Sequence, residues 1–83
     1  MKTREEIFEK LKSILEEMFE VEPNDIVMEA QLYDQLDIDS IDAVDLIARL
    51  SEITGIRVEP EQFKSVETVN DVVEVVYSLT TTG

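Results

Sequence analysis

The stretch LDIDSIDAVDLIARLSEITG, residues 36–55, contains both the start and the stop signal of a helix. Asp39 is a strong N-cap residue, and Asp42 then falls at the third helical position, so both carboxylates lie at the positive end of the helix dipole. Gly55 stands where a glycine commonly terminates a helix. The stretch therefore predicts a helix that begins after Asp39 and ends just before Gly55.

This predicted helix is apolar over most of its circumference. Its apolar residues are Ala43, Val44, Leu46, Ile47, Leu50 and Ile53. Its polar residues recur at spacings of 3, 4 and 3 and form one narrow stripe, which consists of Asp42, Asp45, Arg49 and Glu52. The pattern predicts a helix that packs against others and keeps the polar stripe exposed.

Helical periodicity also predicts a first and a last helix. Thr3 and Glu6 have the spacing of a capping box, and an apolar stripe of helical period follows, so we expect a helix over about residues 4–19. Thr68 begins a second capping-box pattern ahead of the last helix. The apolar face of that helix consists of Val69, Val72, Val73, Val76 and Leu79. The β-branched run of residues 72–77 is also compatible with a strand, but the spacing of the apolar residues fits the helical period better than alternation.

The segments between these helices predict the remaining architecture. Residues 21–38 show no sustained period and indicate a long loop, and loops of this length are usually functional. Residues 59–63 predict a short helix with Pro60 in its first turn, and residues 80–83 predict a disordered tail. We therefore expect a single domain, residues 1–83, that is all-α: an up-and-down four-helix bundle with a short third helix and a long loop between helices one and two.

The composition excludes several classes of function. The 83 residues include no cysteine and no histidine, which excludes disulfides, thiolate metal sites and Ser-His-Asp catalysis, so we expect neither an enzyme nor a metal site. A net charge of −13 repels nucleic acid and favours basic protein partners. No apolar run is long enough to insert into a membrane, and no signal peptide is apparent, so we expect a cytoplasmic monomer.

Ser40 is the residue with the most informative surroundings. It follows the long loop, and Asp39 takes the capping position, so its hydroxyl is not needed to cap the helix. Residues 20–56 carry ten acidic groups and one basic group. Ser40 has no base to activate it as a nucleophile, but it fits a residue that another enzyme modifies, since a phosphodiester on its oxygen would lie at a helix N-terminus. The alternative is that the segment is only a well-capped helix start.

The chain resembles the acyl carrier protein family, whose attachment motif Asp-Ser-Leu stands here as Asp39-Ser40-Ile41. Thr68 and Val69 match the start of the family's last helix, and the order of the helices agrees over nearly the whole chain. The resemblance implies that a phosphopantetheinyl transferase attaches 4′-phosphopantetheine from coenzyme A to Ser40. Acyl intermediates would then travel as thioesters on this arm between enzymes of fatty acid, lipid or polyketide-type biosynthesis.

The resemblance also implies where partners and cargo would bind. The residues expected to dock acyl-loading and acyl-transfer enzymes with basic surfaces are Ile41, Asp42, Asp45, Ala48 and Glu52. A pocket for the acyl chain is expected between the second and last helices, lined by Val44, Ile47, Val69 and Val73. The chain departs from the family in three places: Asp37 replaces a common glycine, Ile41 replaces leucine, and Arg49 interrupts a face that is usually more acidic.

Three other functions are compatible with parts of the pattern. The first is an amino-acid carrier of the peptidyl-carrier type. The second is an unmodified acidic helical adaptor that binds basic proteins. The third is a calcium-buffering domain, although the acidic residues from Asp37 to Asp45 do not have the glycine at loop position 6 or the glutamate at position 12 of an EF-hand.

Overall fold

The computed structural model describes residues 3–82, which form an all-helical domain. The elements are α1 (Arg4–Phe19), the 3₁₀ helix η1 (Pro23–Asp25), α2 (Ser40–Thr54), the 3₁₀ helix η2 (Pro60–Phe63) and α3 (Val69–Thr82). Within residues 3–82 there are thus three α-helices and no named strand, only one isolated bridge between Gln31 and Thr68.

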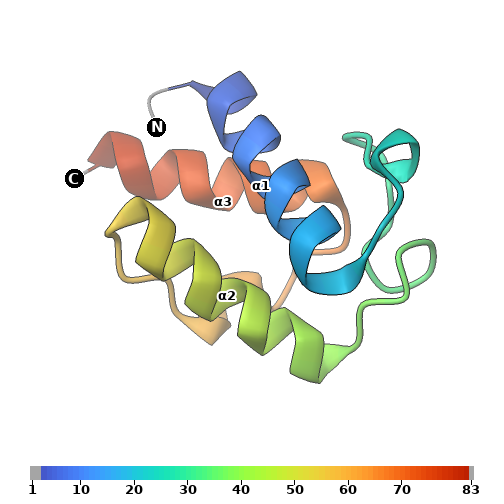
Figure 1. Cartoon of the computed structure of the whole chain (residues 1–83). Helices are drawn as coiled ribbons and strands as arrows, with labels where there is room; N and C mark the ends of the chain where they lie inside the picture. The colour runs from blue at the N-terminus through green and yellow to red at the C-terminus, as the bar shows by residue number, and fades with distance from the viewer. Residues whose placement is uncertain (1–2, 83) are drawn as a thin grey trace.

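The predicted short third helix is a single 3₁₀ helix, so the bundle has three α-helices rather than four. In Figure 1, α2 and α3 both run from right to left, whereas α1 runs from the top toward the lower right. The segment that contains η2 follows α2 in the chain and leads back to the right-hand side of the view, where α3 begins. Its bonds from Gln62 N to Glu59 O (3.0 Å) and from Lys64 N to Glu61 O (3.3 Å) span three residues, as in a 3₁₀ helix.

The bounds of α1 and α2 agree with the sequence prediction because local caps set them. Thr3 caps α1 by accepting a hydrogen bond from Glu6 N at 3.2 Å. Asp39 caps α2, and Gly55 ends it with φ 69°, the left-handed conformation that glycine adopts without strain. The long α2 therefore begins and ends where the sequence predicts.

α3 packs against α1 and forms the centre of the core. The buried residues of α1 are Ile7, Leu11, Ile14 and Leu15, and those of α3 are Val69, Val72, Val73 and Val76. At the start of α1, Arg4 links the two helices: it forms an ion pair with Glu74 of α3, and its guanidinium lies 4.1 Å from the centre of the Tyr77 ring. α3 continues to Thr82 into the segment predicted as a tail, and Thr80 donates a hydrogen bond to the Tyr77 carbonyl at 2.9 Å. Gly83 lies outside the described residues.

The long loop is held against the start of α3 by backbone hydrogen bonds. They run from Leu32 N to Glu67 O (2.9 Å), from Val69 N to Ala30 O (3.0 Å) and from Asn70 N to Met28 O (2.9 Å). The loop also contributes buried side chains, namely Ile26, Ala30, Leu32, Leu36 and Ile38. Val27, in the same segment, is 46 % exposed and is not one of these buried residues. The loop is therefore part of the core, and it sets the position in space of the first turn of α2.

Glu20 adopts an unfavourable backbone conformation at the end of α1, and its replacement by glycine is expected to stabilise the protein. Its φ is 55°, while its N–H bonds Glu16 O at 3.1 Å as in a helix-terminating motif. We expect Glu20→Gly to raise the free energy of unfolding by about 1 kcal/mol, because glycine adopts this conformation without steric cost. Urea denaturation measures the change.

The matched control is Glu17→Gly, which places glycine inside the same helix. This variant is expected to lower the free energy of unfolding by about 1 kcal/mol, since glycine is a poor helix former. A loss of stability in Glu20→Gly would contradict the assignment of strain to residue 20.

The start of α3 depends on a carboxylate, which makes its contribution to stability pH-dependent. Asp71 Oδ2 accepts hydrogen bonds from Glu67 N (3.0 Å) and Thr68 N (3.1 Å), and these bonds hold the pKa of Asp71 below its usual value. A lowered folded-state pKa gives stability that is present above the unfolded-state pKa and is lost as the pH falls through the folded-state value. We expect Asp71→Asn to cost about 1 kcal/mol at pH 7.

Denaturation curves from pH 7 to pH 2 test this expectation. The wild type and Asp71→Asn are expected to converge in stability at the acid end. Asp34→Asn serves as the control, because the Asp34 side chain makes no hydrogen bond with a described residue. A difference between the wild type and Asp71→Asn that persists unchanged at pH 2 would show that charge is not the cause.

Candidate functional site

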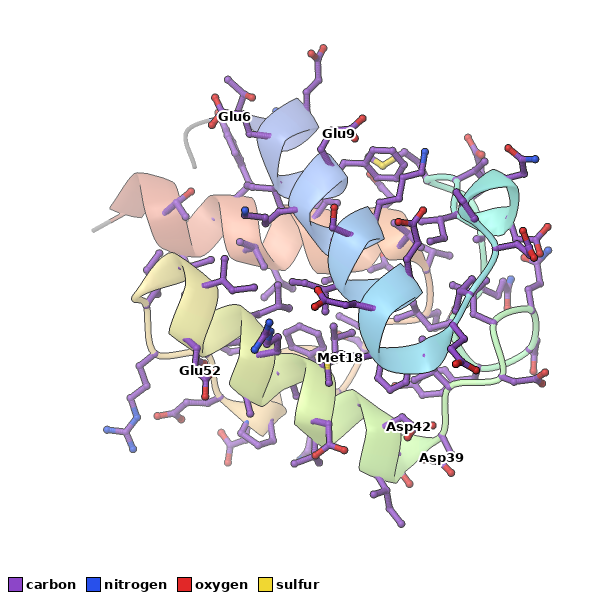
Figure 2. The ribbon with its side chains drawn as sticks, viewed as in Figure 1. Glu6, Glu9, Met18, Asp39, Asp42 and Glu52 are labelled. Carbon is purple, nitrogen blue, oxygen red and sulfur yellow. The ribbon has the colours of Figure 1, made fainter. Side chains whose placement is uncertain are left out.

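The two carboxylates at the start of α2 hold its first turn in place. Asp39 Oδ1 accepts hydrogen bonds from Ile41 N (3.0 Å) and Asp42 N (2.9 Å). Asp42 Oδ2 in turn accepts a longer bond from Asp39 N at 3.4 Å, which completes a capping box. Figure 2 shows both residues where the loop meets α2. The predicted cap is therefore confirmed in detail.

The chain before this turn is positioned by the loop and by one residue in a left-handed conformation. Ile38 N donates to Leu32 O at 3.0 Å, and both side chains are buried. Between Leu36 and Ile38, Asp37 has φ 55°. Positions of this kind favour glycine and accept aspartate better than most residues, which explains how Asp37 replaces the glycine of the family pattern.

Ser40 is the first residue of α2, and its side chain is exposed. Its hydroxyl makes no hydrogen bond with any described residue, because Asp39 satisfies the neighbouring backbone N–H groups. An exposed, unbonded hydroxyl at a capped helix start is accessible to another enzyme.

The charges around Ser40 are acidic and unpaired. Asp37, Asp39 and Asp45 are exposed, and within residues 3–82 none of them forms an ion pair. The one cation of α2, Arg49, lies 3.8 Å from Glu52 in an i, i+3 pair. In the part of the chain that the structure describes, no three acidic side chains converge into a possible metal site.

The outward face of α2 combines these acids with exposed apolar side chains. Ile41 is 74 % exposed and Val44 is 53 % exposed. The predicted docking residues Asp45, Ala48 and Glu52 are also exposed, and Asp42 is half-buried. All five predicted docking residues therefore lie on the solvent side or at its edge.

Val44 lies outside the core, in contrast to its predicted role as a pocket residue. The other three residues predicted to line the pocket, Ile47 (5 %), Val69 (0 %) and Val73 (0 %), are buried. Val44 follows Ile41 by three residues and so shares its face, whereas the buried side of α2 consists of Leu46, Ile47 and Leu50. The helical spacing from exposed Ser40 and Ile41 was the signal that could have identified Val44 as exposed.

Met18 is a second apolar residue that is exposed, although it belongs to the apolar stripe of the first helix. It is 38 % exposed at the end of α1 and extends toward α2 in Figure 2. Its position in the apolar stripe of α1 gave no sign of this exposure. Only the packing of α2 beside α1 shows that Met18 lies at the edge of the buried face of α1.

Comparison with known proteins identifies relatives over nearly the whole chain. The family model for a phosphopantetheine attachment site matches residues 9–76. Acyl carrier protein 2 of Ralstonia nicotianae is 52 % identical over 93 % of this chain and 95 % of its own length. The acyl carrier proteins of Coprothermobacter proteolyticus (90 % and 92 % covered) and Thermotoga maritima (88 % and 90 % covered) are both 40 % identical. Among the described residues no helix is long and apolar enough to cross a membrane.

Proposed function

The chain belongs to the acyl carrier protein family, and from this membership we propose that Ser40 is the residue to which phosphopantetheine is attached. The observation that carries the assignment is the exposed hydroxyl of Ser40, unbonded to any described residue, within Asp39-Ser40-Ile41 at the start of α2. The relatives are named acyl carrier proteins, which supports an acyl group as the cargo.

The residues at the start of α2 fit such an attachment. The Ser40 oxygen is free to form one phosphodiester bond, and the exposed position leaves room for a long arm directed into solvent. The helix N-terminus favours the negative charge of the phosphodiester. Asp37 and Asp39 oppose it, so the covalent bond rather than ionic contacts would hold the arm.

The chain supplies the attachment residue for the arm, while its partner enzymes catalyse the reactions. The arm ends in a thiol, which carries the acyl group as a thioester. Asp39 and Asp42 fix the direction of the helix from which the arm starts. The chain has no histidine to deprotonate Ser40, so the phosphopantetheinyl transferase must provide the base and the cations. Enzymes of fatty acid, lipid or polyketide-type biosynthesis would load and unload the arm.

We place the docking surface for these enzymes on the outward face of α2. Ile41 and Val44 provide exposed apolar contact area next to Ser40, and Asp42 and Asp45 provide unpaired negative charge beside it. Ala48 continues the face without a bulky side chain. A partner with a small apolar depression rimmed by lysine or arginine would complement this surface.

Intact mass spectrometry tests the proposed function directly. The protein is incubated with coenzyme A, magnesium and each of several phosphopantetheinyl transferases, and the modified residue is located in a proteolytic digest. A gain of one phosphopantetheine at Ser40 is expected. If no transferase modifies the protein, the unmodified acidic adaptor becomes the better hypothesis. Loading with fatty acyl groups rather than amino acids separates the acyl carrier from the peptidyl-carrier type.

We further propose that the acyl chain enters the core between α2 and α3, next to Ile47, Val69 and Val73. These side chains are buried, so entry requires α2 to move outward. Each methylene that leaves water contributes about 0.8 kcal/mol before that cost. The melting temperature of the acylated protein is therefore expected to exceed that of the unloaded form and to rise with chain length. A melting temperature independent of chain length would place the acyl chain in solvent.

A further inference from the structure

The exposed face of α2 is divided into two parts of different charge. In the first part, nearest Ser40, Asp42 and Asp45 have no ion pair with a described residue. In the second part, Arg49 lies 3.8 Å from Glu52 and offsets its charge. Arg49 is the only lysine or arginine between Lys12 and Arg57. A partner that lies along α2 therefore meets negative charge first and a cation further along.

The pair formed by Arg49 and Glu52 is weak enough to be exchanged for a contact with another protein. The side chains are 44 % and 72 % exposed, and the separation of 3.8 Å is close to the limit for an ion pair. Exposed pairs of this kind contribute little to stability. Arg49 can therefore leave Glu52 and bind a carboxylate on a partner at little cost.

Arg49 also lies within reach of any partner that binds at Ser40. It follows Asp45 by four residues and Asp42 by seven, so the three side chains share one side of the helix. The rise of an α-helix places Arg49 about 14 Å beyond Ser40 along the axis. An interface of standard size covers about 800 Å² of each protein and extends beyond that distance.

We propose that Arg49 determines which partner enzymes bind this carrier. It selects enzymes that present cations to Asp42 and Asp45 and a carboxylate to Arg49, and it discriminates against enzymes with an uninterrupted basic surface. The proposal rests on the proposed function of α2 as the docking helix. Like-charge contacts are an effective way to reject a wrong partner, and Arg49 makes such a contact with an all-basic surface.

Charge reversal at residue 49 tests the proposal with two phosphopantetheinyl transferases of known structure as probes. The first is chosen for an unbroken row of lysine and arginine at its carrier-binding surface. The second is chosen for an aspartate or glutamate within that row. The variants are Arg49→Glu and Arg49→Gln. The control is Arg57→Glu, which makes the same change in net charge at a residue outside α2 that is 89 % exposed and lies 3.4 Å from Glu59.

The measured quantity is kcat/KM for modification of each variant, at low salt and at 0.5 M salt. Arg49→Glu is expected to raise kcat/KM about five- to tenfold with the all-basic transferase and to lower it about as much with the other. Arg49→Gln is expected to fall between the wild type and Arg49→Glu. Arg57→Glu is expected to change both values less than twofold, and high salt is expected to reduce all differences.

Two outcomes would overturn the proposal. In the first, Arg49→Glu shifts kcat/KM in the same direction with both transferases. In the second, Arg57→Glu reproduces its effect, which would show that net charge alone matters. The modification of Ser40 in the wild type is recorded in the same assays. If wild-type Ser40 is modified but the ratio between the transferases does not respond to residue 49, only this inference fails; if it is not modified at all, the proposed function fails first.

Discussion

Ser40→Ala is expected to abolish modification by phosphopantetheinyl transferases and to leave the fold intact. The Ser40 hydroxyl makes no hydrogen bond with a described residue, and the cap of α2 is provided by Asp39. Alanine is the best helix former, so the free energy of unfolding is expected to change by less than about 0.5 kcal/mol. The circular dichroism spectrum and the urea denaturation curve of the variant should overlay those of the unmodified wild type.

The matched control for this variant is Ser65→Ala, which removes another exposed serine hydroxyl. It is expected to gain one phosphopantetheine at the wild-type rate, because Ser65 follows Lys64 rather than an aspartate. A mass gain in Ser40→Ala would move the attachment site to another residue while the carrier function stands. A large loss of stability in Ser40→Ala would contradict the assignment of the cap to Asp39.

The parts of the fold that the sequence predicted are those that depend on neighbouring residues. Asp39 and Gly55 define α2 because capping and left-handed glycine act within a few residues of the helix ends. Thr3 defines the start of α1 in the same way. Ser40 could be singled out as the candidate site for the same reason, since Asp39 before it takes the capping position and leaves the Ser40 hydroxyl free, while its proposed role as attachment residue came from the resemblance of Asp39-Ser40-Ile41 to the family motif.

The parts that the sequence did not predict depend on contacts between distant segments. Met18 belongs to the apolar stripe of α1, and only the packing of α1 against the other helices decides that it lies at the edge of the core, whereas the spacing of Val44 from Ile41 was a local signal that the prediction did not use. The left-handed conformation of Asp37 is set by a loop whose ends are held by Leu32 and Ile38. The pattern of residues 59–63 fits one turn of helix, and it did not distinguish an α-helix from the 3₁₀ helix observed.

The two faces of α2 are expected to separate stability from partner binding, and two isoleucines of this helix test the separation. Ile47 is 5 % exposed and packs in the core, whereas Ile41 is 74 % exposed next to Ser40. Ile47→Ala is expected to lower the free energy of unfolding by about 2–5 kcal/mol, because it leaves a cavity. A domain of this size has a total stability of about 4–12 kcal/mol, so the loss is a large fraction of it.

Ile41→Ala removes the same atoms from the same helix, but its expected effect is on partner binding. Its stability is expected to change by less than about 0.5 kcal/mol, since the side chain is mostly in water already. Its kcat/KM for modification is expected to fall about fivefold or more, because truncation of a side chain that fills a pocket at the centre of an interface costs about 1 kcal/mol or more. Both variants are tested by urea denaturation and by the modification assay, and the assay is run at a temperature where Ile47→Ala remains folded.

Folded Ile47→Ala is expected to be modified at nearly the wild-type rate. Equal losses of stability in the two variants, or an unchanged rate for Ile41→Ala, would show that the exposed face of α2 is not the surface that partners bind.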